Sequence, residues 1–283
     1  ATWMIGTRQV DESLRWLTNA PPATQADAGI AVCIADAYLA RRDWAALQRI
    51  TAKGNWEETE FVRHSLQARA WRELGQSVSS EAAWLSAVRA TGNKPHALAL
   101  LARQASNWGW KHEEEQLLWQ IVERFPGERL APGALSALLS KAGNTRGLNR
   151  LAGIAVGQNA ANVAAQNDLA ATSLLLKTQL PRAHEIARDL FTKYPSNGAI
   201  ASTYAFSLFT QGKIEEARQA FAGVNPDVLQ QPGIALYYGL VLGTNSPDEA
   251  RKYLQLAANG VQLPEEKALA VDALRQQGSV RNP

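Results

Sequence analysis

Histidine is the residue here with the widest chemistry, because imidazole can bind a metal ion or act as a general base beside a second ligand or an acid. The four histidines are His64, His96, His112 and His184, far apart in the sequence. Acidic residues follow His112 in a run, Glu113 to Glu115. A zinc-protease helix needs a second histidine one turn after the first, where this chain has Gln116. We interpret the segment as the solvated first turn of a helix, where carboxylates suit the helix dipole.

The other reactive groups also lack the partners that catalysis needs. The pairs Glu57-Glu58 and Glu265-Glu266 stand at the starts of predicted helices, again where carboxylates suit the dipole. Residues 153–157 have a glycine at each end but lack the lysine and the hydroxyl residue of a phosphate-binding loop. The single cysteine, Cys33, has apolar neighbours and predicts a buried structural thiol. We expect no catalytic residue, no metal site and no cofactor, and predict that the chain is not an enzyme.

Composition predicts a folded helical protein without a large nucleic-acid surface. Of the 283 residues, 46% are hydrophobic, and strong helix formers dominate. The 29 basic and 26 acidic residues are scattered, so nucleic acid is not an expected partner. No stretch approaches the roughly 18 apolar residues of a membrane-spanning helix. The chain begins at Ala1 and has its one methionine at Met4, which suggests a processed protein or a piece of a longer one. The localisation, cytoplasm or periplasm, therefore stays open.

Small residues recur within predicted helices at a period of about 34 residues, which is typical of helical repeats. They are Ala35, Ala68, Ala102, Ala137, Ala171 and Ala205, with Tyr238 next in the register. A second helix shares the period in the later repeats, where the corresponding residues are Ala183, Ala217 and Ala250, followed one turn later by Ala187, Phe221 and Leu254. Two helices that cross at small residues predict a hairpin, and stacked hairpins cover one another's apolar surface.

The segment from Ser202 to Phe221 shows this hairpin most clearly, with Ala205 on the first helix, Gly212 at the turn and Ala217 on the second helix. Prolines follow two of the units, at Pro126 and Pro195. The pattern resembles the tetratricopeptide repeat family. The resemblance implies an all-α fold in which about seven helical hairpins and terminal helices form a right-handed superhelix.

We predict five segments along the chain. A leading half-repeat covers residues 1–22, with a helix from Val10 to Leu17, and tryptophan-rich repeats 1–3 cover 23–132. A degenerate repeat with a short first helix, and with Asn149 where alanine is expected, covers 133–165. It is either an ordinary irregular repeat or a hinge between two halves. Repeats 5–7 cover 166–262, and a capping helix that begins at Pro264, followed by a tail, covers 263–283.

The resemblance also implies that the first helices line a concave groove that binds a partner. At about 100° per residue, positions beside the small residues form one stripe. The candidate groove residues are Asp36, Arg69, Arg72, Arg103, Asn107, Asp168, Leu175, Phe206 and Phe209. The arginines are candidates for pairing with carboxylates or phosphate on a partner, or for internal salt bridges. The two phenylalanines are candidates for a peptide pocket, or for packing.

We therefore predict a non-catalytic scaffold that binds a peptide or protein, and family analogy suggests a bacterial assembly or envelope complex. The alternatives are an accessory solenoid of a larger enzyme or secretion protein, a helical enzyme with convergent carboxylates in a deep closed cavity, and a helical-repeat RNA binder. Acidic and apolar groups in the stripe argue against RNA. Members of the resembling family that bind chaperone tails use lysine and asparagine on this face, whereas this chain has Val32, Ser65 and Ala99 there. The oligomeric state is left open.

Overall fold

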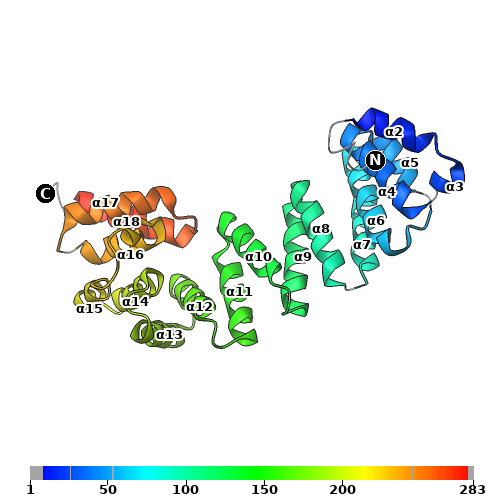
Figure 1. The fold of residues 1–283 in the computed structure, drawn as a ribbon. Coiled ribbons are helices and arrows are strands. Elements are labelled where there is room, and N and C mark those ends of the chain that lie inside the picture. The colour runs from blue at the N-terminus through cyan, green and yellow to red at the C-terminus, as the bar shows by residue number, and fades with distance from the viewer. Residues whose placement is uncertain (1–8, 26, 53, 93, 244, 280–283) are drawn as a thin grey trace. The chain divides into compact units, whose positions relative to one another are not determined.

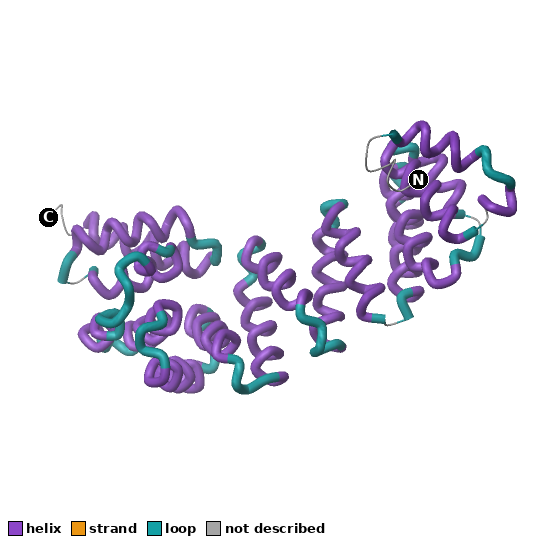
Figure 2. The backbone as a smooth tube through the Cα atoms, viewed as in Figure 1, coloured by secondary structure: helices purple, strands orange, loops and turns teal. Residues whose placement is uncertain are grey.

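The computed structural model describes residues 9–279 except 26, 53, 93 and 244 (Figure 1). The described residues form α-helices and two short 3-10 helices joined by turns, with no strand among them (Figure 2). The chain divides into two compact units, which we call the N-terminal and the C-terminal unit, between Ala131 and Pro132. The predicted all-α fold is confirmed.

The N-terminal unit consists of a leading segment and three helical hairpins. The leading segment contains α2 (Val10–Thr18), which packs on α4, and α3 (Pro22–Gln25). First helices of neighbouring hairpins pack on each other, α4 on α6 and α6 on α8, so the hairpins stack in series. The hairpins are α4 (Ala28–Arg41) with α5 (Trp44–Thr51), α6 (Glu60–Glu73) with α7 (Ser77–Ala90), preceded by η1 (Glu57–Thr59), and α8 (Pro95–Asn107) with α9 (Lys111–Arg124).

The C-terminal unit consists of four hairpins and a closing helix, α18 (Pro264–Ser279). Here too the first helices stack in series, α12 on α14 and α14 on α16. The hairpins are α10 (Leu130–Lys141) with α11 (Thr145–Gln158), α12 (Val163–Leu175) with α13 (Leu180–Lys193), α14 (Gly198–Thr210) with α15 (Ile214–Gln219), and α16 (Pro232–Leu242), preceded by η2 (Val228–Gln230), with α17 (Pro247–Gly260). Counted over the residues that the structure describes, the hairpins of the two units together agree in number with the prediction.

Local sequence explains where these helices begin and end. Asparagine and aspartate side chains cap several helix N-termini, and Asn197, for example, accepts from the backbone N–H groups of Ala199 and Ile200. The predicted turn at Gly212 has φ of 77°, a left-handed conformation that glycine adopts without strain. There the backbone N–H of Lys213 donates to the carbonyl oxygen of Leu208 at 3.0 Å, which ends α14 and starts the return helix.

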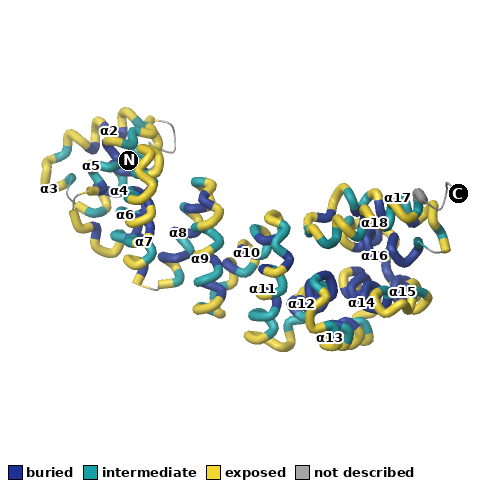
Figure 3. The backbone as a smooth tube through the Cα atoms, turned by 180° about the vertical axis from the view of Figure 1, so that it is seen from behind, coloured by how far each residue is buried: buried dark blue, intermediate teal, exposed yellow. Residues whose placement is uncertain are grey.

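The predicted small residues of the second helices are buried, as their register required. Ala183, Ala217 and Ala250 lie in the interior, and so do Ala187, Phe221 and Leu254. Four of the predicted first-helix positions, Ala35, Ala68, Ala102 and Ala205, are buried as well. Buried residues lie on the helix faces that meet within a unit, whereas the outer faces are exposed (Figure 3).

The predicted register is wrong in α10 and shifted in α12. In α10 the buried residues are Ala131, Leu135 and Leu139, and Ala137 is exposed. At about 100° per residue, a position two residues beyond Leu135 points to the opposite side of the helix. In α12 the fully buried residue is Ala170, while Ala171 is half-buried.

Three local predictions also differ from the structure. The first helix of the fourth hairpin is not short, because α10 has 12 residues and α16 has 11. The helix expected through Phe221 ends at Gln219, and the backbone N–H of Ala222 then donates to the carbonyl of Gln219 in a tighter turn ahead of Pro226. Cys33 is half-buried beside the contact of α2 with α4. The predicted segment boundaries and the hinge stay predictions.

The end of the C-terminal unit packs against its beginning. A Cβ atom at Gly143, in the turn between α10 and α11, would lie 3.3 Å from Pro264 Cδ at the start of α18. The hydroxyl of Thr145 donates to the carboxylate of Glu265, a contact between residues 120 positions apart. The predicted capping helix therefore reaches back to the first hairpin of its unit.

Close helix approach should make one helical glycine intolerant of a methyl group. A Cβ atom at Gly239 in α16 would lie 2.9 Å from Leu254 Cγ and 3.2 Å from the backbone oxygen of Ala250 in α17. Gly239→Ala should lower the free energy of unfolding by about 1–2 kcal/mol, because overpacking outweighs the gain in helix propensity. Urea denaturation followed by circular dichroism measures the change.

The matched control is Gly153→Ala in α11, where a Cβ atom would have no neighbour within 4 Å. This change should raise the free energy of unfolding by up to about 1 kcal/mol through helix propensity alone. Equal effects of the two substitutions would contradict the close approach of α16 to α17.

Candidate partner-binding site

Arg69, the first of the three predicted groove arginines, is held within the N-terminal unit. Its guanidinium lies over the rings of Trp44, Trp108 and Trp110, 5.6 to 5.7 Å from each centroid. It also forms a 2.8 Å ion pair with Glu73 on the same helix, and its side chain is 19% exposed. Such a guanidinium stabilises the aromatic cluster through cation–π contacts and packing of its stem.

Arg72 also has partners within the N-terminal unit, whereas Arg103 does not belong to the cluster of tryptophan rings around Arg69. The Arg72 guanidinium lies 3.5 Å from the Trp110 ring centroid and forms an ion pair with Glu113 of α9. Arg103 and Asn107, on α8, are exposed. The structure thus brings Arg69 and Arg72 together around Trp110, with their charges already matched by glutamates.

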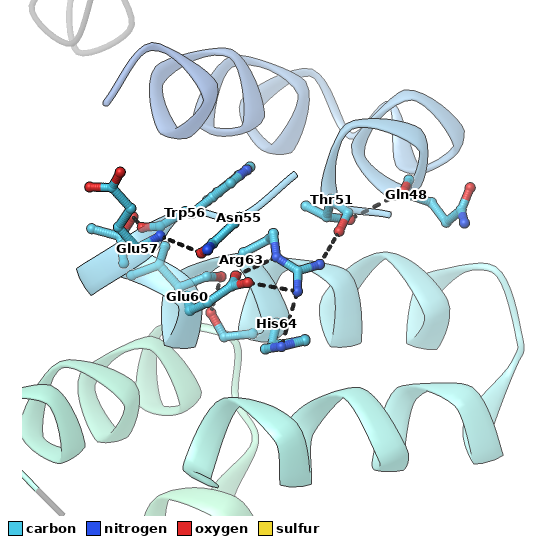
Figure 4. Close-up of polar contacts among 11 residues, drawn as sticks. Gln48, Thr51, Asn55, Trp56, Glu57, Glu60, Arg63 and His64 are labelled. Atoms are coloured by element: carbon cyan, nitrogen blue, oxygen red, sulfur yellow. Dashed lines mark hydrogen bonds and ion pairs between the residues drawn. The ribbon is translucent and has the colours of Figure 1, made fainter. Parts of the chain in front are cut away.

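A second polar cluster in this unit joins α5 to α6 (Figure 4). Arg63 pairs with Glu60, donates to the carbonyl oxygen of Thr51 at 2.6 Å, and lies 3.1 Å from His64 Nε2. Burial, followed by the charge of Arg63, lowers the pKa of His64. The arginine satisfies the C-terminal end of α5, so this cluster has a structural role.

Two predicted groove residues of the C-terminal unit are core residues. Leu175 and Phe206 are buried in one hydrophobic cluster, and the ring of Phe206 lies 4.6 Å from that of Tyr237. Phe209 is half-buried against the same cluster. Asp36, in the N-terminal unit, is half-buried, and loss of hydration raises the pKa of its carboxyl group. The phenylalanine positions therefore serve packing more than an open pocket.

The C-terminal unit contains a cavity of about 1010 Å³. Its walls come from the first helices α10, α12, α14 and α16, from α11, and from the closing helix α18. Apolar side chains form much of the wall, among them Leu148, Leu151, Leu175, Ile234 and Leu263. Polar side chains lie between them, namely Ser136, Ser140, Asn162, Asn167, Asp168, Thr172, Ser202, Thr203, Gln231, Tyr237 and Glu266.

Two carboxyl groups face this cavity, and the pKa of each is raised. Asp168 is an exposed residue, yet the loss of hydration beside the surrounding wall raises the pKa of its side chain. Burial also raises the pKa of Glu266, although a hydrogen bond from Tyr237 opposes the shift. The Tyr237 hydroxyl donates to Glu266 Oε1 at 3.1 Å, and burial followed by the nearby carboxylate raises the pKa of Tyr237 well above its usual value. This contact joins α16 to α18.

Asn167 is the most unusual polar group of the cavity wall. The residue is only 9% exposed, and among the described residues no donor forms a hydrogen bond with its buried Oδ1 atom. A buried polar atom without a partner costs roughly 1–3 kcal/mol, so such atoms are rare and often mark a site. By contrast, Asn149 of α11 donates to Thr172 Oγ1 and Ser173 Oγ of α12, both at 2.9 Å.

Sequence reasoning found Asp168 but missed Asn167 and Glu266. One position of the predicted stripe lies three residues before the small residue of the repeat. With Ala171 as that small residue, this position is Asp168. With the buried Ala170 as reference, the same offset gives Asn167. Glu266 was interpreted only as a first-turn carboxylate, because nothing local indicates that α18 returns to the first hairpin.

Comparison with known proteins gives structural likeness only. No protein-family model matches the chain, and no curated protein matches it significantly. A tetratricopeptide repeat protein from Parabacteroides merdae covers 96% of this chain and 99% of its own, with 13% identity and a TM-score of 0.44. The chain has a tetratricopeptide-like repeat fold. That statement rests on the serial hairpins described above.

Two further solved structures are similar at lower scores. The hetero-tetramer of Cut9 and Hcn1 from APC/C matches 97% of this chain and 78% of that chain, with 13% identity and a TM-score of 0.32. The tetratricopeptide domain of P58(IPK) matches 100% of this chain and 97% of that chain, with 11% identity and a TM-score of 0.28. Within the described part of this chain, no helix is long and apolar enough to cross a bilayer. The same residues contain no group of three or more histidine, cysteine or acidic side chains arranged to hold a metal ion.

The internal role of Arg69 can be tested by truncation. Arg69→Ala should lower the free energy of unfolding by about 1–2 kcal/mol, because it removes the cation–π contacts and the packed stem. Arg103→Ala, on an exposed position, should change it by less than about 0.5 kcal/mol. Chemical denaturation monitored by tryptophan fluorescence compares the two. An equal, small effect of the two substitutions would contradict this internal role of Arg69.

The raised pKa of Glu266 predicts a specific pH dependence of stability. Between the unfolded and the higher folded pKa the native state binds more protons, so this group lowers stability as pH rises through that window. Glu266→Gln keeps an acceptor for Tyr237 but cannot ionise. The variant should be at least as stable as the wild type at neutral pH and lose that advantage in acid. Urea unfolding from about pH 4 to about pH 8 measures the difference.

The control is Glu216→Gln, at an exposed position of α15. This substitution should leave the pH dependence of stability unchanged. A Glu266→Gln profile that stays parallel to the wild type would contradict the burial of this carboxyl group.

Proposed function

We propose that the chain is a non-catalytic scaffold that binds an extended peptide segment of a partner protein in the cavity of the C-terminal unit. The cavity itself carries this proposal. Its volume of about 1010 Å³ reaches the upper end of the range of small-molecule sites, which is about 300–1,000 Å³. Residues of the first helices α10, α12, α14 and α16 and of α18 bound it, so it offers room for several residues of a chain.

The composition of the wall supports a peptide as the occupant. The wall combines apolar residues such as Leu151, Leu175 and Ile234 with polar ones such as Ser202, Asn167 and Asp168. Peptide recognition uses this combination, in which apolar pockets hold side chains and fixed polar groups orient the chain. The setting of this binding in a bacterial assembly or envelope complex stays a prediction.

The arginines of the N-terminal unit are a weaker candidate for the main contact. Arg69 and Arg72 already pair with Glu73 and Glu113, and a partner carboxylate would have to displace these residues. Arg103 is exposed and keeps its charge available. We therefore place the principal binding surface in the C-terminal unit.

One observation favours an enzyme as a second candidate. Asp168 and Glu266 line the same cavity, and both have a raised pKa, as a general acid requires. The hydrogen bond from Tyr237 to Glu266 and the contact of α18 with α16 give the glutamate a structural role as well. The binding experiment can separate the two candidates.

Blocking the cavity should abolish peptide binding. Peptides are first selected from a random display library on the intact chain, then synthesised and titrated by calorimetry. Ala199→Trp places a large ring at an exposed cavity position of α14 and should raise Kd at least tenfold. Gln219→Trp, exposed on α15 outside the cavity, should leave Kd unchanged.

Equal Kd values for the wild type and Ala199→Trp would refute the cavity as the binding site. Mass spectrometry of the peptide after incubation tests the enzymatic candidate. An intact peptide agrees with a scaffold, whereas cleavage that is lost in Glu266→Gln would replace it with an enzyme.

A further inference from the structure

The cavity of the C-terminal unit has an unusual balance of charge and hydrogen-bonding groups. Its described wall includes the carboxyl groups of Asp168 and Glu266 but no lysine, arginine or histidine side chain. Its other polar side chains are neutral. An occupant therefore meets negative charge in a partly dehydrated space, where charge pairs are stronger than in water.

Several hydroxyl groups of the wall present oxygen lone pairs, because their hydrogens are used elsewhere. Ser202 Oγ and Thr203 Oγ1 both donate to the carbonyl oxygen of Ala199, at 2.9 and 3.0 Å. The Tyr237 hydroxyl donates to Glu266. These three groups can therefore accept a hydrogen bond from an occupant, but they have no hydrogen left to give.

Asn167 provides an independent indication of the same chemistry. Its side chain is nine-tenths buried in the cavity wall, and its Oδ1 atom has no donor among the described residues. It lies beside Asp168 on α12. An unpaired buried acceptor next to a carboxylate calls for a ligand that donates several hydrogen bonds and carries positive charge.

We propose that the segment bound in this cavity carries a lysine or arginine side chain, whose cationic head is held by Asp168, Glu266 and Asn167. The inference rests on the proposed function and specifies its ligand. Ammonium and guanidinium groups offer three and five N–H donors with no acceptor, which matches an acceptor-rich wall. The apolar wall residues Leu151, Leu175 and Ile234 suit the aliphatic stem and the neighbouring residues.

Peptide pools with one fixed central residue test the proposal. The intact chain is immobilised and offered synthetic peptides in which the centre is Lys, Arg, Glu or norleucine and the flanks are randomised. The Lys and Arg pools should be retained at least tenfold better than the Glu and norleucine pools. Norleucine keeps the length of lysine without its charge, so the difference isolates the cationic head.

Variants of the wall should remove this preference selectively. Asp168→Asn, Glu266→Gln and Asn167→Leu should each reduce the ratio of Lys-pool to norleucine-pool retention about tenfold. Asp189→Asn, an exposed carboxylate of α13 outside the cavity, removes the same charge and should keep the ratio. Circular dichroism of each variant confirms that it is folded, and the within-variant ratio corrects for loss of active protein.

The outcomes separate the two proposals. Retention of all pools to the same extent, lost in Ala199→Trp, would overturn the cationic ligand and leave the peptide scaffold standing. Retention of no pool above the Ala199→Trp level would overturn both. Displacement of the Lys pool by equimolar spermidine or by calcium would show that a free polyamine or a metal ion is the occupant, and would overturn the peptide assignment.

Discussion

The close approach of paired helices at small residues is the constraint on which both units depend. A hairpin of two amphipathic helices cannot hide its apolar side alone, so each one relies on the next. Ala205 on α14 and Ala217 on α15 are completely buried, and Gly239 on α16 leaves no room for a methyl group. Larger residues at these positions would push the helices apart and uncover the apolar side chains that flank them. Serial stacking then follows, because the first helices meet their neighbours through the same faces.

This constraint made the fold predictable from sequence. The small residues recur at a nearly fixed period, and turn glycines such as Gly212 stand between them, so the number of hairpins could be predicted. Register within single helices was less secure. In an alanine-rich helix such as α12, Ala170 and Ala171 are equally small, and only packing against the neighbouring helices decides which one is buried. An error of one residue turns the stripe by about 100°, and this was enough to miss Asn167.

The candidate site was less predictable, because it depends on contacts between distant segments. Tyr237 reaches Glu266 across 29 positions, and Thr145 reaches Glu265 across 120. Nothing in the local pattern around Pro264 shows that the closing helix brings a carboxylate to the cavity. Nor does periodicity show that Arg69 and Arg72 are occupied by Glu73 and Glu113, since the second pairing joins two different hairpins.

The two units differ in whether their charged side chains have partners of opposite charge. In the N-terminal unit the Arg69 side chain lies against tryptophan rings and pairs with Glu73. These contacts offset the cost of removing its guanidinium from water. In the C-terminal unit, the cavity residues include no cationic side chain to pair with Asp168 and Glu266, and the buried Oδ1 atom of Asn167 has no donor among the described residues. A donor-rich partner would supply the hydrogen bond that Asn167 Oδ1 lacks and a positive charge beside the two carboxyl groups.

The position of α18 explains why Glu266 lies at the cavity wall. A terminal helix in a repeat array ordinarily covers the apolar face of the last hairpin and presents a polar face to water. Here α18 packs on α16 and α17, as a cap would, but its first turn also meets the turn between α10 and α11 through Pro264 and Glu265. Glu266 is thereby held at the cavity wall by Tyr237 instead of facing solvent. The helix α18 therefore completes the cavity. Glu266 lies in the cavity wall because the neighbouring Glu265 anchors the helix to the turn between α10 and α11.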